Sequence, residues 1–227
     1  MTNKKLKIIF STFDDIKNPI YAGGGAFAIH EVAKHLGKKY DVTVVCGNYN
    51  GAKNENIEGV DYKHIGLTFF GSRLAQLFFH FTLPFYVLTE RFDLWIESFT
   101  PPFSTSFTPL FTRKPVIALV HMLGADDMTR KYHLPFSIIE NFGLKFYKQF
   151  IVLTKYSMKK IRRYNSSAQI QIIGNGVNLP IQPNHLSNNG NLSFLGRIEV
   201  DQKGIDLLLE AYSKLLKKID IHEDLQI

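Results

Sequence analysis

The sequence predicts an α/β protein whose core is a mostly parallel sheet, and two observations support this class. Short apolar runs rich in Val, Ile and Phe alternate along the chain with segments whose apolar residues recur at helical spacing. This alternation is typical of parallel strands joined by helices that cover both faces of a sheet. With 227 residues, of which 45% are hydrophobic and 13% aromatic, the chain is also large enough to bury a sizeable core.

The expected elements follow one another through most of the chain. Apolar runs predict strands at residues 6–11, 42–46, 62–65, 94–96, 116–120, 150–153 and 170–173. Helical spacing predicts helices at residues 27–36, 69–87, 138–147 and 156–164. Because proline lacks a backbone donor, the helix at 69–87 is expected to break near Pro84.

A polar, turn-rich stretch at residues 179–190 separates this part of the chain from a shorter second part. We expect a Rossmann-like N-terminal domain at residues 1–178, a linker at 179–190 and an incomplete C-terminal domain at 191–227. The last of these begins with a buried strand at 192–195 and a helix from Ile205 to about Lys218. Fewer than about forty residues cannot close a doubly wound domain. We therefore expect this helix to lack a sheet behind its apolar face, and the chain to be truncated relative to a two-domain enzyme.

The turn between that strand and helix concentrates positive charge. Arg197 follows the strand, and Lys203 and Gly204 stand where the helix opens. A guanidinium and an ammonium at the carboxyl end of a strand, beside the N–H groups of a helix N-terminus, form an anion site. Such a site suits a diphosphate better than a single carboxylate. The alternative is an ordinary strand–helix unit whose Arg and Lys face solvent.

A second candidate site is the glycine triplet Gly23, Gly24 and Gly25, between the first strand and the first helix. Consecutive glycines let a ligand approach the main chain closely, with a helix N-terminus just behind them. The loop starts well after Phe10 and lacks the G-x-G-x-x-G spacing directly after the strand, so it is a poor dinucleotide fingerprint. Without other information, such a triplet is more often a flexible turn than a ligand site.

Two further candidates stand at the ends of strands. His121 closes the strand at 116–120, and Glu97 closes the strand at 94–96. The carboxyl edge of a parallel sheet is where α/β proteins bind ligands, so Glu97 is a candidate for the side that binds an acceptor. The alternatives are a hydrogen-bonded structural histidine and a solvated loop carboxylate.

Four segments resemble glycosyltransferase family 4, the retaining nucleotide-sugar transferases of the GT-B fold. Phe-Leu-Gly-Arg-Ile at 194–198 and Lys-Gly-Ile-Asp-Leu-Leu-Leu-Glu-Ala at 203–211 look like the opening of the family's second domain. Ile-Val-Leu-Thr-Lys-Tyr-Ser at 151–157 resembles the family's strand followed by a Ser-led helix, and Ile-Gly-Asn-Gly-Val-Asn at 173–178 resembles its Asn-Gly-Val-Asp turn. Asn178 departs from the final Asp, which is a mild change because both side chains hydrogen-bond the local backbone of a turn.

The resemblance implies site roles. Arg197, Lys203 and Gly204 would bind the diphosphate of a UDP- or GDP-sugar, the glycine triplet would face the diphosphate and the transferred sugar, and His121 would lie near the sugar or the acceptor. The expected catalytic residues are His121, Arg197 and Lys203, because departure of the nucleotide builds negative charge that the two cations would stabilise.

The same resemblance limits what this chain is expected to do. The sequence contains no Asp-x-Asp motif and no clustered histidine and carboxylate ligands, so no cofactor and no metal are expected. The family's later Glu-x7-Glu segment would fall beyond Ile227, so the chain alone is expected to bind donor weakly and to transfer little.

The amino-acid composition limits the chemical classes of binding partner. Lys and Arg exceed Asp and Glu by seven, which favours nucleotide sugars, phospholipid head groups or nucleic acid as partners. We expect no nucleic acid, because neither zinc-finger spacing nor an aromatic and basic RNA-binding pattern is present. Cys46 is the only cysteine, which excludes an internal disulfide and a cysteine-built metal site and indicates a reducing, cytoplasmic setting. No segment is typical of a signal peptide or of a spanning helix.

An apolar helix and a basic helix suggest peripheral contact with the inner face of a membrane. The first contains Phe78, Phe79, Phe81, Phe85 and Tyr86, and the second contains Lys155, Lys159, Lys160, Arg162 and Arg163. The alternative is an ordinary core helix and a solvated basic face.

The expected function is transfer of a sugar, of the hexosyltransferase type, to a glycan, lipid-linked or cell-envelope acceptor in polysaccharide biosynthesis. Two other functions stay open. The chain is alternatively a non-catalytic or split-enzyme binding module that needs a second polypeptide to complete the C-terminal domain. The third is a nucleotide-binding protein unrelated to sugar transfer.

Overall fold

The computed structural model describes residues 5–68, 71–101, 103–177, 192–196, 198 and 200–217. The chain divides into two compact units, residues 1–177 and residues 178–227. The predicted linker at 179–190 lies outside the described residues, and the predicted domain boundaries stay a prediction. No helix among the described residues combines the length and the apolar character that crossing a membrane requires.

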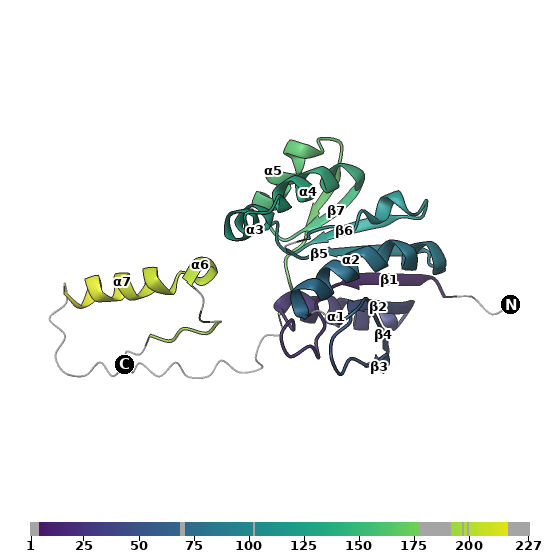
Figure 1. Cartoon of the computed structure of the whole chain (residues 1–227), viewed down its shortest axis with the longest axis horizontal. Helices are drawn as coiled ribbons and strands as arrows, with labels where there is room; N and C mark the ends of the chain where they lie inside the picture. The colour runs from purple at the N-terminus through teal and green to yellow at the C-terminus, as the bar shows by residue number, and fades with distance from the viewer. Residues whose placement is uncertain are drawn as a thin grey trace. The chain divides into compact units, whose positions relative to one another are not determined.

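Within the described residues, the first unit is built on an eight-stranded sheet in the order β3-β4-β2-β1-β5-β6-β7-β8 (Figure 1). Its strands are β1 (Lys7–Thr12), β2 (Asp41–Gly47), β3 (Glu55–Ile57), β4 (Val60–Ile65), β5 (Leu94–Phe99), β6 (Val116–Val120), β7 (Gln149–Val152) and β8 (Gln169–Ile172). Neighbouring strands are parallel except for the antiparallel pair β3 and β4. The predicted α/β class with a mostly parallel sheet is therefore confirmed.

Helices cover both faces of this sheet. They are α1 (Gly24–Gly37), α2 (Ser72–Thr89), α3 (Ala125–Tyr132), α4 (Phe136–Gly143) and α5 (Lys155–Tyr164), with the short 3-10 helices η1 (Thr108–Leu110) and η2 (Leu144–Phe146). Successive strand residues face opposite sides of a sheet. On one side Phe10 and Val44 pack with Ile29 of α1. On the other side Ile9 packs in a separate core that contains Phe79 of α2.

The order of the strands reverses direction between β1 and β5. The connection through α1 takes the chain from β1 to β2, whereas the connection through α2 returns it to β5 on the other side of β1. In open α/β sheets, ligands bind outside the carboxyl ends of the strands at such a switch point. We therefore expect a ligand-binding site at the carboxyl ends of β1, β5 and β6.

Most predicted strands and helices are present within a few residues of their expected bounds, but β3 and α3 were missed. The hairpin from β3 to β4 turns at Glu58 and Gly59, whose φ values are +51° and +86°. Two-residue hairpins of this kind favour Asn or Asp followed by Gly. Glutamate rarely adopts a positive φ. Only Gly59, the second residue of the turn, therefore indicates a hairpin in the sequence.

The predicted break at Pro84 is wrong. The helix α2 runs without interruption from Ser72 to Thr89. Pro84 removes one hydrogen bond of the helix, but Phe79, Leu83 and Val87, which lie on both sides of it, are all buried in the same core. The apolar area that these side chains bury outweighs one missing hydrogen bond.

The described part of the second unit contains α6 (Val200–Lys203) and α7 (Ile205–Leu216). They meet at Gly204, whose φ of +61° is a conformation that glycine adopts without steric cost. The helix predicted to open at Lys203 and Gly204 is thus present, and as predicted it buries none of its residues.

The buried strand predicted at residues 192–195 is wrong, because these residues form no strand and Leu195 is fully exposed. A strand needs a neighbour for its backbone hydrogen bonds, and the described residues offer this segment none.

Candidate functional site

The glycine triplet and His121 lie side by side at the carboxyl edge of the sheet. Gly24 and Gly25 open α1, and Gly23 stands at the cap position without a side-chain hydrogen bond. His121 follows the last residue of β6. A Cβ atom on Gly25 would lie 3.5 Å from Cδ2 of His121, so the first turn of α1 passes the imidazole in van der Waals contact. Two candidates that are distant in the sequence are thereby brought together.

The imidazole of His121 lies in a dry setting. Neither of its ring nitrogens has a hydrogen-bond partner among the described residues. Burial lowers the pKa of His121 below its ordinary value of 6.5. A buried polar group without a hydrogen-bond partner costs about 1–3 kcal/mol. A ligand that hydrogen-bonds this ring would remove that cost.

Asp14 places a carboxylate at the start of α1. A Cβ atom on Gly23 would lie 3.4 Å from Oδ2 of Asp14. A negative charge near a helix N-terminus is favourable because it faces the positive end of the helix dipole. The N-terminus of α1 is therefore already faced by one anion before any ligand binds.

Sequence reasoning missed a buried cluster that holds the loop between β1 and α1. Asp15 is 2% exposed, and its Oδ2 atom accepts a hydrogen bond from Nε2 of His64 at 2.6 Å. Its Oδ1 atom accepts the backbone N–H of Lys17 at 2.9 Å, and the Tyr49 side chain bonds the same carboxylate. Burial raises the pKa of Asp15, but these hydrogen bonds outweigh burial and leave the pKa below its ordinary value. No motif spacing links these residues, so no sequence signal pointed to them.

The rest of the loop is also ordered by local contacts. The side-chain oxygen of Asn18 accepts the backbone N–H groups of Ile20 and Tyr21 at 2.9 and 3.0 Å. The Tyr21 ring packs edge-on against Phe13, with ring centroids 5.2 Å apart. Because the loop is fixed at both Phe13 and Tyr21, it presents the glycine triplet in a defined position.

Glu97 is enclosed rather than presented to solvent. It is 2% exposed, and its carboxylate accepts the backbone N–H of Ser106 and the hydroxyl of Tyr147. Burial raises the pKa of Glu97 above its ordinary value of 4.5. The acceptor-side role of Glu97 stays a prediction, and these contacts favour a structural role in holding the loop after β5.

The candidates in the second unit are only partly described. Arg197 lies outside the described residues. Lys203 is the last residue of α6 and is exposed, and Gly204 separates it from α7. The proposed diphosphate site therefore stays a prediction.

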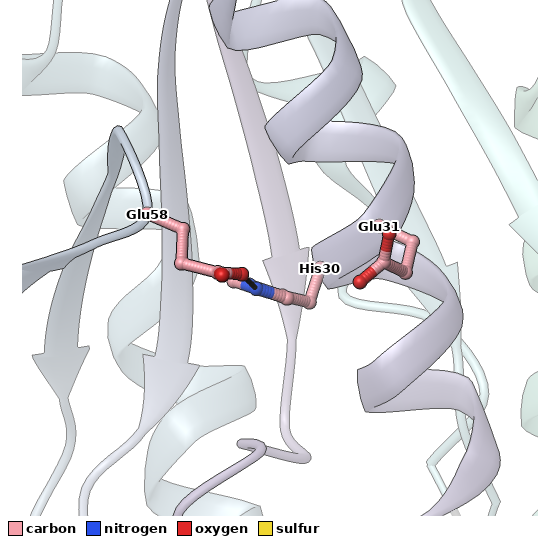
Figure 2. A group of neighbouring side chains, drawn as sticks. All are labelled: His30, Glu31 and Glu58. Atoms are coloured by element: carbon pink, nitrogen blue, oxygen red, sulfur yellow. Dashed lines mark hydrogen bonds and ion pairs between the residues drawn. The ribbon is translucent and has the colours of Figure 1, made fainter.

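Among the described residues, one group has the ligand atoms to hold a metal ion. Atoms of His30, Glu31 and Glu58 lie within 4.8 Å of one another, and Figure 2 shows the His30 ring directed at the Glu58 carboxylate. Nε2 of His30 lies 2.9 Å from Oε2 of Glu58, and Nζ of Lys34 lies 2.8 Å from the same oxygen. The other ring nitrogen of His30 bonds the Tyr62 hydroxyl at 2.9 Å. This is a satisfied ion-pair cluster, in which a metal ion would compete with the Lys34 ammonium for the Glu58 carboxylate.

The chain is an α/β protein, and the paired glycine and histidine lie at the carboxyl edge of its sheet near a topological switch point, where open α/β sheets bind ligands. The sequence model of Glycosyltransferase Family 4 matches residues 22–180. The chain belongs to this family, so the resemblance found in the sequence is confirmed. No curated protein matches the chain.

Several solved structures are similar to the chain. HepE from Anabaena, in complex with UDP and glucose, is 15% identical with a TM-score of 0.49, over 76% of this chain and 45% of that one. The trehalose 6-phosphate synthase from Burkholderia multivorans is 14% identical with a TM-score of 0.45, over 71% and 42%. The sucrose-phosphate synthase from Thermosynechococcus elongatus is 11% identical with a TM-score of 0.47, over 93% and 99%. This chain spans less than half the length of the first two proteins.

Proposed function

We propose that the protein transfers a sugar from a UDP- or GDP-sugar to a glycan, lipid-linked or cell-envelope acceptor, as a retaining transferase of the hexosyltransferase type. Membership in the family supports the class of reaction. The observation that carries the proposal within the first unit is the contact of Gly25 with His121 at the switch point. It combines partly exposed main chain with a polar ring whose nitrogens have no hydrogen-bond partner among the described residues.

The chemistry of this edge suits a sugar better than a phosphate. A sugar hydroxyl can both donate a hydrogen bond to the neutral His121 ring and accept one from it, whereas an ionised phosphate can only accept. We therefore assign the transferred sugar to the neighbourhood of Gly23, Gly25 and His121. The lowered pKa of His121 suits an imidazole that hydrogen-bonds a sugar hydroxyl as the neutral ring.

The proposed reaction needs positive charge at the leaving group. The bond between the sugar and the diphosphate breaks, the oxygen of the acceptor hydroxyl bonds to the sugar in its place, and the proton of that hydroxyl passes to the departing diphosphate, which leaves with the bonding electron pair. Arg197 and Lys203, with helix N–H groups after Gly204, are the residues that we propose to stabilise this charge. No cofactor and no metal enter the proposal.

Donor binding tests this proposal directly. Saturation-transfer NMR with UDP-glucose, GDP-mannose, UDP and GDP detects the weak binding that we expect of this chain. His121→Ala and Gly25→Val are each expected to reduce binding of the sugar nucleotide by about tenfold, the value of one lost or obstructed hydrogen bond to a buried site. Gly174→Val is the matched control, because a Cβ at Gly174 meets nothing within 4 Å. Equal binding by all three variants would contradict the assigned site.

A second candidate function is a binding module that a second polypeptide completes. The observation that favours it is α7, where Leu207 and Leu209 are 66% and 62% exposed. Light scattering of the purified chain tests this idea, because an unpartnered apolar helix promotes association. A monodisperse monomer that binds sugar nucleotide without a partner would count against it. For either function we infer a cytoplasmic protein in contact with the inner face of a membrane.

A further inference from the structure

The helix α2 carries an apolar stripe on the side that faces away from the sheet. Phe79 and Leu83 fill the core beneath it. The stripe consists of Leu74, Phe81, Phe85 and Leu88, which are 43%, 64%, 70% and 63% exposed. Their spacing of seven, four and three residues keeps them on one side of a helix. Apolar side chains of this size are usually buried, so a continuous exposed row marks an interaction surface.

Two segments near α2 in the chain's fold carry further exposed apolar residues. The 3-10 helix η1 contacts α2, and its residue Leu110 is 56% exposed. Phe107, just before η1, lies with its ring centroid 6.3 Å from that of Phe142 in α4, and Phe142 is itself exposed. We call the set Leu74, Phe81, Phe85, Leu88, Leu110 and Phe142 the apolar surface.

Cations flank the apolar surface. Arg91 follows the end of α2, Arg113 follows η1, and Nζ of Lys145 lies 5.9 Å from the ring centroid of Phe142. None of these three cations forms an ion pair with another described residue. Glu90, the acid next to Arg91, is already paired with two lysines at 3.3 and 3.6 Å. Arg91 and Arg113 line one cavity with Leu88, and two acids of that cavity, Glu90 and Asp93, are paired with lysines, so these acids do not neutralise the two arginines.

We propose that the apolar surface docks the protein on an anionic phospholipid bilayer, with α2 lying along the interface. Interfacial helices combine an aromatic and aliphatic face with cations at its borders, and the cations attract anionic head groups. The charge of these cations favours a bilayer over a second copy of the chain, because two such sets of cations would repel each other. The docking itself does not depend on the proposed function. Only its biological purpose does, which is to bring the protein to a lipid-linked acceptor.

The structure changes which residues carry the membrane contact expected from the sequence. Phe79 is 2% exposed and belongs to the core. Lys160 is buried against Glu140, with Nζ 2.9 Å from its carboxylate and 2.7 Å from that of Asp126. These two residues of the expected membrane face are therefore structural.

Vesicle co-sedimentation of the full chain tests the apolar side of the proposal. The probes are neutral phosphatidylcholine vesicles and vesicles in which a third of the lipid is phosphatidylglycerol. We expect binding to the anionic vesicles that weakens with added salt. The double variant Phe81→Ser/Phe85→Ser should bind at least about tenfold more weakly, since burying one phenylalanine contributes more than a tenfold change in partitioning. Phe27→Ser is the matched control, because Phe27 is 52% exposed on α1, across the sheet, and it should bind as the parent does.

A second pair of variants tests the charge. Arg91→Gln/Arg113→Gln should weaken binding by about fivefold for each charge removed. Arg162→Gln/Arg163→Gln removes two exposed charges from α5 and should have a clearly smaller effect. Circular dichroism melts confirm that each variant is folded.

Three results would overturn the proposal. They are the absence of salt-sensitive binding, equal weakening by Phe27→Ser and by the Phe81/Phe85 pair, and a dimer that this pair abolishes while no vesicles are bound. Binding of UDP-glucose, measured on the same variants, separates this outcome from failure of the proposed function, because the apolar surface contains no residue of the candidate donor site.

Discussion

Nε2 of His64 lies 2.6 Å from Oδ2 of Asp15, and this contact ties β4 to the loop that leads from β1 into the glycine triplet. Because β2 lies between β1 and β4 in the sheet, the contact spans the end of β2. Tyr49, just after β2, packs its ring edge-on against His64 with centroids 5.6 Å apart. Three strand ends thus converge on Asp15, and the position of the candidate donor site depends on that convergence.

Replacing Asp15 with Asn should destabilise the protein in a pH-dependent way. The pKa of Asp15 is held below its ordinary value of 3.8, against the opposing effect of burial, by hydrogen bonds from His64 and the Lys17 N–H. A carboxyl group whose folded pKa is lowered stabilises the fold above the unfolded pKa, and this contribution is lost as pH falls through the folded value. At neutral pH we expect a loss of about 1–3 kcal/mol in the free energy of unfolding. Urea unfolding from pH 7 to pH 3 should show the difference shrinking below about pH 4.

Asp127→Asn is the matched control for this experiment. Asp127 is exposed and its carboxylate contacts Arg130 at the surface, so its loss should change stability little. If Asp15→Asn is no more destabilising than Asp127→Asn, the cluster does not hold the loop.

The imidazole of His121 should resist protonation in the folded protein. Burial lowers its pKa below 6.5, and the unfolded chain therefore binds a proton at higher pH than the folded chain does. The stability that this residue contributes is present above pH 6.5 and is lost as pH falls toward the lowered folded pKa. Proton NMR of the ring hydrogens, assigned with His121→Gln, measures the folded pKa directly. The same resonance in urea is the internal control, and an unchanged pKa on folding would show that the ring is open to water.

The sequence was sufficient to predict the parallel sheet and the placement of His121, because buried strands are apolar runs and their carboxyl ends meet at one edge. It was not sufficient to predict the contact between His64 and Asp15, since that contact depends on strand order and not on spacing along the chain. Pro84 shows a different limit. Pro84 lacks a backbone N–H, as the sequence shows, but the helix continues through it because residues before and after it are buried in the core. The strand expected at residues 192–195 shows a third limit, because an apolar run forms a strand only where a neighbouring strand is present.

Gly47 is required at the end of β2 by the Phe13 ring. A Cβ atom at Gly47 would overlap Cδ2 of Phe13, and Phe13 is buried between Tyr21 and Phe79. Gly47→Ala should therefore destabilise the fold by about 1–3 kcal/mol, the usual cost of overpacking a core. It should also displace the loop that follows Phe13, which hydrogen exchange at residues 13–25 would detect. Gly174→Ala, at a position with open space, should change neither measurement. Retained stability in Gly47→Ala would mean that the ring has room to move.

The cluster of His30, Glu31 and Glu58 should not bind a divalent metal ion tightly. Oε2 of Glu58 already accepts from both His30 and Lys34, and hydrogen bonds from Lys34 and then His30 hold the pKa of Glu58 below its ordinary value. A divalent ion on this carboxylate would lie close to the Lys34 ammonium, and the two cations would repel each other. A metal that binds only the folded state raises the melting temperature. Zinc or manganese added to the apo chain is therefore expected to leave the melting temperature unchanged.

Glu58→Gln should lower the melting temperature without metal, because it weakens both contacts, and should respond to metal as the parent does. A metal-dependent rise in the parent that disappears in Glu58→Gln would instead establish a metal site on α1, and the metal-independent reaction proposed for the family fold would then need to be tested again for this chain.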